Sequence, residues 1–90
     1  MANAIGLLET KGMVGLVAAT DAMAKAAKVQ IMKRIEIGGG FVTTVVGGDV
    51  GSVRAAVEAG VESLKAGGGT LVASNVIARP QAGVIEEFTR

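Results

Sequence analysis

The sequence predicts a small α/β (α+β) sandwich, in which one four-stranded, mainly antiparallel sheet carries two helices on one face. The hydrophobic pattern switches between a two-residue period, typical of strands, and a three-to-four-residue period, typical of helices. The segments follow in the order β-α-β-β-α-β, and glycine clusters separate several of them. Two split βαβ units of this kind make a ferredoxin-like domain. The length of 90 residues fits one small domain, residues 1–90.

The first third of the chain predicts a strand and a helix. Ala4–Glu9 is short and apolar and is expected to form the first strand, after which Thr10–Gly12 turns the chain. A helix is predicted from about Val14 to Lys28, because apolar residues recur every three or four positions. Its apolar stripe comprises Leu16, Ala19, Met23 and Ala26. Its opposite, charged face comprises Asp21, Lys25 and Lys28.

The middle of the chain predicts two strands joined by three glycines. Val29–Ile37 returns to a two-residue period with one mostly apolar face, which Lys33 interrupts, so the register stays open here. Phe41–Val46 is rich in β-branched residues and is expected to be the returning strand. We expect Gly47 and Gly48 to end it.

The last part of the chain predicts a helix, a strand and a short helical tail. Asp49 is a suitable N-cap for the helix, and Gly67–Gly69 supply its end. Thr70–Ala78 is the expected last strand, ended by Pro80, and Ile85–Phe88 is expected to add a short C-terminal helix. The apolar stripe of the long helix comprises Val50, Val53, Val57, Val61 and Leu64.

Composition argues against several classes of function. The net charge is only +1, and two Phe are the only aromatic residues, which disfavours nucleic-acid binding. No apolar run approaches the roughly 20 residues of a membrane span. The chain has neither His nor Cys, so the commonest general base and the commonest metal ligand are missing. We therefore predict no enzyme, no catalytic residue, no metal and no cofactor, and the aromatic-poor, half-apolar chain suggests self-association instead.

The three consecutive glycines Gly38–Gly40 need an explanation. A hairpin turn needs only one or two glycines. A phosphate-binding loop fits poorly, because no Lys-Ser/Thr follows and a strand stands where a helix should begin. A third interpretation is that another copy of the chain brings its backbone close to this point.

Basic residues form a second group of interest. Lys25 and Lys28 share one helix edge, and Arg79 stands at the end of the last strand, immediately before Pro80. Solvation alone explains such residues. A lateral protein contact is the alternative interpretation.

Four sequence stretches resemble one known family. "GLLETKG", "ATDAMAKAAKV", "IGGGFVTTVVGGDVGSVRAAVEAG" and "VIARP" look like the single-domain, hexamer-forming shell proteins of bacterial microcompartments such as carboxysomes and metabolosomes, in the same order from Ala4 to about Pro80. The resemblance implies six-membered rings that tile into flat sheets around encapsulated enzymes in the bacterial cytoplasm. The implied partners are further copies of the chain, other shell proteins including vertex pentamers, and encapsulated enzymes, with no nucleic acid and no membrane.

The resemblance also implies roles for individual residues. The loop matching Gly38–Gly40, together with Ile37, would line a central pore for small polar metabolites, and its free N–H groups could face an anion. Lys25 looks like the lysine that lies against its two-fold mate on the next hexamer. The expected hexamer–hexamer edge comprises Lys25, Lys28, Arg79 and Pro80.

The chain departs from the usual pattern of that family at three positions. Gly47 stands where an arginine is usual, and Gln81 where a histidine is usual. Gly39 stands where a serine often occupies the pore, so backbone alone would line that ring. The alternative function is a ferredoxin-like oligomer that binds a metabolite, because a fold alone does not determine function.

Overall fold

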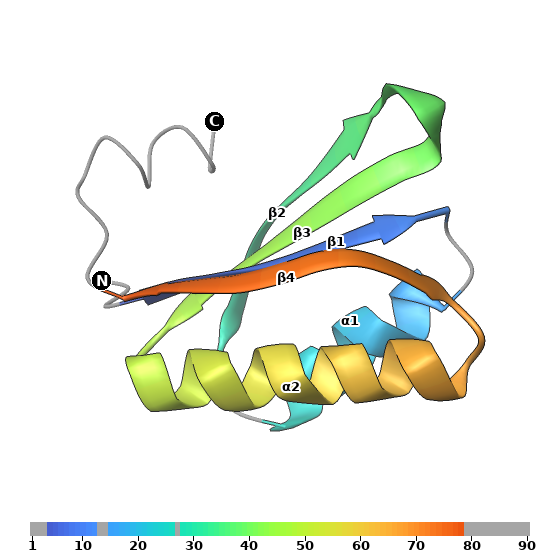
Figure 1. Ribbon diagram of the computed structural model, residues 1–90. Coiled ribbons are helices and arrows are strands. Elements are labelled where there is room, and N and C mark those ends of the chain that lie inside the picture. Colours follow the sequence, from blue (N-terminus) through green and yellow to red (C-terminus); the bar gives the residue numbers. More distant parts are fainter. Residues whose placement is uncertain (1–3, 13–14, 27, 79–90) are drawn as a thin grey trace.

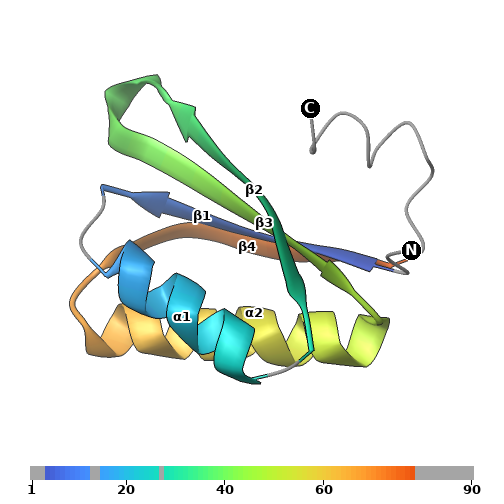
Figure 2. The same ribbon diagram turned by 180° about the vertical axis from the view of Figure 1, so that it is seen from behind.

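The computed structural model describes residues 4–12, 15–26 and 28–78, and these form the predicted two-layer sandwich. Both helices lie on the same face of one sheet (Figures 1 and 2). The strand order is β2-β3-β1-β4, and each pair of neighbours is antiparallel. The elements are β1 (Ala4–Lys11), α1 (Leu16–Ala26), β2 (Gln30–Ile37), a 3-10 turn (Gly38–Gly40), β3 (Phe41–Gly48), α2 (Val50–Ala66) and β4 (Thr70–Ala78).

The element order and the four-stranded sheet are confirmed, whereas several predicted ends are wrong. β1 continues past Glu9 to Lys11, because its last residues pair with both β3 and β4. Gly47 and Gly48 do not end β3, since Gly47 pairs with Ile5 on one side and Gln30 on the other. The backbone ladder on both sides therefore outweighs the low strand preference of glycine.

The first helix is shorter than predicted. It begins at Leu16 and ends at Ala26, so Lys28 lies in the connection to β2. Leu16, Ala19 and Met23 are buried as expected, but Ala26 is exposed. Ala26 stands in the last turn, where the apolar stripe has already left the core. The predicted C-terminal helix at Ile85–Phe88 lies outside the described residues.

A β-bulge in β2 explains the irregular position of Lys33. Ile31 pairs with Val46, whereas Lys33 pairs with Val45, so β2 holds one extra residue at this step. The bulge shifts the alternation of side chains. Ile31 consequently shares the helix side of the sheet with Val46, and Ile35 points to the opposite side. The single apolar face predicted for this strand is therefore wrong.

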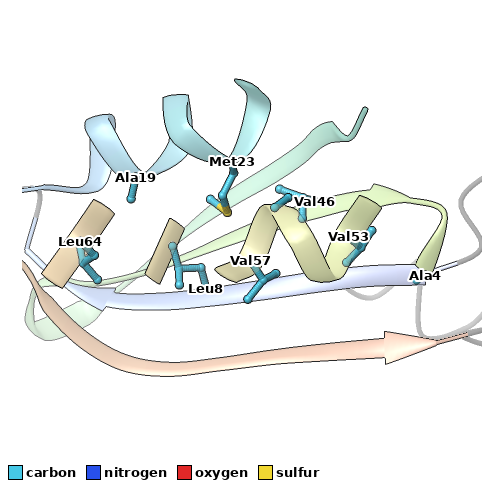
Figure 3. Packing of buried hydrophobic residues seen from close by; sticks show 9 residues of the cluster. Ala4, Leu8, Ala19, Met23, Val46, Val53, Val57 and Leu64 are labelled. Atoms are coloured by element: carbon cyan, nitrogen blue, oxygen red, sulfur yellow. The ribbon is translucent and has the colours of Figure 1, made fainter. Parts of the chain in front are cut away.

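The hydrophobic core lies between the sheet and the helices and is built from Ala, Val and Leu side chains together with Met23 (Figure 3). A Cβ atom on Gly6 would lie 2.6 Å from Val57 Cγ2 and 2.8 Å from Val53 Cγ1. A Cβ atom on Gly60 would lie 2.7 Å from Met23 Cγ. Glycine thus lets α2 lie very close to β1 and α1. Close approach of the layers is how a core without Trp or Tyr is filled.

Both ends of α2 agree with the prediction. Its apolar stripe faces the core, with Val53, Val57 and Leu64 buried. Asp49 caps the helix: its Oδ1 accepts a hydrogen bond from the Ser52 N–H at 2.9 Å, and the Ser52 hydroxyl donates to its Oδ2 at 2.8 Å. The hydrogen bonds from Ser52 lower the pKa of the Asp49 carboxyl.

In the described part of the chain, neither helix has the length and apolarity that crossing a bilayer requires.

Candidate functional site

The glycine turn closes the hairpin between β2 and β3. Ile37 pairs with Phe41 across the hairpin, and Gly38–Gly40 connect them. The Gly12 N–H donates to the Gly40 carbonyl at 2.6 Å, which ties the turn to the end of β1. In both overall views the hairpin tip stands away from the two helices (Figures 1 and 2). The turn is therefore a projecting feature built almost entirely of backbone.

The turn needs glycine at two of its three positions. Gly39 and Gly40 each have φ of +83°, in the left-handed region that disfavours other residues. Gly38 has no positive φ, and a Cβ atom there would meet nothing within 4 Å. The described part of the subunit therefore offers neither a conformational nor a packing reason for glycine at position 38.

A shallow hollow of about 270 Å³ lies beside the turn. Phe41 forms part of its wall, and the Lys11 ammonium lies 5.9 Å from the centre of the Phe41 ring. Glu36, one residue before Ile37, also lines the hollow and is exposed. Sequence reasoning missed Glu36, although its place beside the turn was visible from the strand pattern. The described residues that line it are Gly12, Glu36, Gly38, Gly39, Gly40, Phe41 and Val42.

The predicted edge residues are only partly described. Lys25 is exposed on α1, and its ammonium lies 2.9 Å from the Asp21 carboxylate, one helical turn earlier. Hydrogen bonding to Asp21 and then its negative charge raise the pKa of Lys25. Lys28 is exposed just beyond the helix. Arg79 and Pro80 lie outside the described residues.

A second hollow, of about 420 Å³, lies on the sheet face away from the helices. Most of its lining surface is apolar, although Thr43, Ser74 and Asn75 contribute polar groups, and Glu9 is the one ionisable residue among the described residues that line it. Within residues 4–12, 15–26 and 28–78, no three His, Cys, Asp or Glu side chains gather in a way that could hold a metal ion. The lining comprises Leu7, Glu9, Ile35, Thr43, Ala73, Ser74 and Asn75.

Comparison with known proteins shows one consistent likeness. A family model described as the BMC domain matches residues 4–80. The carboxysome shell protein CsoS1A of Hydrogenovibrio crunogenus is 47% identical over 81 residues, which cover 90% of this chain and 84% of that protein. The carboxysome shell protein CsoS1 of Prochlorococcus marinus strain SARG is 46% identical over 84 residues, which cover 93% of this chain and 82% of that protein.

Two longer proteins contain a region similar to this chain. The probable carboxysome shell protein CsoS1E of Prochlorococcus marinus strain MIT 9313 is 48% identical over 81 residues, and the chain spans only 40% of its length. Among solved structures, a microcompartments protein from Desulfitobacterium hafniense superposes with a TM-score of 0.85 at 33% identity. That match covers 96% of this chain and 48% of the other chain.

Proposed function

Because the chain belongs to the BMC domain family of bacterial microcompartment shell proteins, we propose that it forms a cyclic homohexamer that tiles into flat sheets. It is a structural shell protein, and its place is the microcompartment shell in the bacterial cytoplasm. The proposed sheets enclose enzymes, and the glycine turn lines a central pore for small polar metabolites. Other shell proteins, including vertex pentamers, are the proposed partners.

The glycine at position 38 is the observation that best supports the pore. Gly39 and Gly40 are explained by the turn itself, whereas Gly38 has a conformation open to any residue and free space around it. Six copies of the turn around one axis would supply the missing reason. Side chains at position 38 would meet one another there, and glycine leaves the passage open. Ile37, Gly38, Gly39 and Gly40 are the proposed pore-lining residues.

The position of the hairpin is compatible with such a ring. Its tip stands clear of α1 and α2, so neither helix of the same subunit blocks the approach of other tips (Figure 1). The Gly12–Gly40 hydrogen bond holds the turn against the end of β1. A turn fixed in this way supports a pore of constant width better than a freely moving loop does.

Lys25 and Lys28 are the proposed edge residues that the structure describes. Both side chains are exposed, and the long stem of Lys25 is available for packing along a neighbouring hexamer. Each ring would repeat this contact on six edges, so a small loss at each edge multiplies across a sheet. Arg79 and Pro80 complete the proposed edge by resemblance alone.

Native mass spectrometry and electron microscopy test ring and sheet separately. The wild-type chain should give a six-fold mass and extended flat sheets at high concentration. Lys25→Gln should keep the ring and lose the sheets. Asp21→Asn is the matched control, because it removes the same Lys25–Asp21 ion pair and leaves the lysine in place. A wild-type spectrum that contains monomers and no hexamer would refute the ring. Normal sheets from Lys25→Gln would refute the assignment of Lys25 to the hexamer edge.

The hollow on the sheet face supports a second candidate function. Its volume of about 420 Å³ falls within the range of small-molecule pockets, roughly 300–1,000 Å³. A metabolite-binding oligomer would use such a hollow and would form discrete rings that change on adding the metabolite. Sheets that form without any added metabolite favour the shell function.

A further inference from the structure

We infer that Glu36 sets the charge preference of the opening at the glycine turn, so that cations pass more readily than small anions. The inference rests on the proposed pore, because a single carboxylate on an isolated subunit cannot discriminate between cations and anions. It goes further than the pore itself by naming the side chain that discriminates and the sign of the preferred solute. It also opposes the expectation that free N–H groups would favour an anion.

The position of Glu36 supports this role. It pairs with Val42 in the second rung of the hairpin from the turn, and it lines the same hollow as Gly38–Gly40. Its side chain is exposed. The three glycines carry no side chains, and among the described residues that line this hollow Glu36 is the only ionisable one. Any ring of turns around one axis therefore brings several copies of this carboxylate near the passage.

No described cation forms an ion pair with Glu36. Within the described ranges the salt bridge joins Lys25 to Asp21, and neither Lys11 nor Arg34 reaches the Glu36 carboxylate. Arg34 lies on the same face of β2 but two residues farther from the turn, about 7 Å along the strand, so its charge is farther from the opening than that of Glu36. The exposed carboxylate of Glu36 is thus the charged group nearest the turn on its face of β2.

Lys11 is the competing charge near the turn. It pairs with Phe41, one rung from Val42, so alternation points it to the face of the sheet opposite to Glu36. Its ammonium lies beside the Phe41 ring, and Lys11 does not line the hollow. Glu36 is therefore better placed than Lys11 to act on the opening.

A ring of carboxylates acts more strongly than the backbone dipoles of the turn. Rings of acidic side chains select cations in known pores. An N–H group carries only a partial charge, whereas each carboxylate carries a full one. The Debye length is about 8 Å at physiological ionic strength, so charges at the rim of a narrow opening are felt across it. An anion would consequently meet repulsion before it reaches the glycine N–H groups.

The test is an ion-selectivity measurement on sheets of the full chain laid over a nanometre aperture. A KCl gradient across the sheet gives a reversal potential, whose sign reports whether K⁺ or Cl⁻ passes more readily. The wild type should prefer K⁺. In Glu36→Gln the permeability ratio of K⁺ to Cl⁻ should fall towards one, and in Glu36→Lys it should invert. Glu58→Gln removes an exposed glutamate on α2 and should leave the ratio unchanged.

Failure of this inference can be distinguished from failure of the pore. If the sheets conduct and Gly38→Leu blocks the current, but Glu36→Gln keeps the wild-type ratio, the pore stands and the role of Glu36 is refuted. A wild type that prefers Cl⁻ and loses this preference in Lys11→Gln would assign the selectivity to Lys11 and also refute it. If Gly38→Leu leaves the current unchanged, the proposed pore itself is wrong.

Discussion

Glycines occur both in the core and at the hairpin tip, and the two groups have different physical reasons. Gly6 and Gly60 face the core, where a Cβ atom would lie 2.6–2.8 Å from Val57 Cγ2, Val53 Cγ1 or Met23 Cγ. Gly38 lies at the tip, where a Cβ atom would meet nothing within 4 Å. The subunit alone explains the core glycines. The described residues give no reason for glycine at position 38, and we propose contacts between subunits as that reason.

The largest effect on stability is expected for Gly6→Ala. The new methyl group would overlap Val53 and Val57 and push α2 away from β1. Overpacking of this kind typically costs about 1–3 kcal/mol of unfolding free energy. Urea unfolding at one fixed protein concentration measures the loss, because assembly couples stability to concentration. Gly51→Ala, at an exposed position where the nearest atom lies at 3.5 Å, should cost nothing. Equal stability of Gly6→Ala and wild type would contradict the claim that close packing in the core requires glycine at position 6.

An intermediate effect is expected for Gly39→Ala. The positive φ of +83° places alanine in the left-handed region, at a cost of roughly 1–2 kcal/mol. Gly39→Asn should recover part of this loss, because asparagine tolerates that conformation better than alanine. Urea unfolding of both variants checks the order. Equal stability of Gly39→Ala and Gly39→Asn would indicate that the turn rearranges. The distinction between Gly39, which the turn requires, and Gly38, which it does not, would then fail.

Features that depend on local sequence could be predicted, whereas features that depend on contacts with distant parts of the chain could not. Helix caps and strand periods are local, so Asp49 and the strand Thr70–Ala78 were predicted correctly from sequence. The bulge beside Lys33 and the continuation of β3 through Gly48 depend on partner strands, which single-strand patterns do not contain.

The candidate site was predicted in part for the same reason. The glycine triplet was visible as an anomaly, but its separation into two turn glycines and Gly38 required backbone angles. The place of Glu36 beside the turn was visible in the sequence, but its part in the lining of the hollow required the structure. The roles of Lys25 and Lys28 rest on contacts between rings, and one subunit leaves them a prediction.

The smallest effect on stability concerns the Asp49 cap, another residue whose role is complete within the subunit. Its lowered folded-state pKa means that the cap stabilises the fold above the ordinary value of 3.8, and that this contribution is lost as the pH falls through the folded value. Asp49→Ala should therefore lower the urea midpoint at pH 7. The difference from wild type should shrink below about pH 4. A difference that stays constant down to pH 2 would show that the charge of Asp49 is irrelevant to the cap.

The most direct test of the central claim is to pair the stability and the conductance of Gly38→Leu. We expect this variant to form six-membered rings, to unfold at the same midpoint as wild type, and to lose the ionic current through the sheet. Gly51→Leu, an exposed glycine in the first turn of α2 at the opposite end of β3, should retain the current. An unfolding midpoint that falls as far as that of Gly6→Ala, or a current equal to wild type, would contradict the claim that Gly38 serves the assembly rather than the subunit.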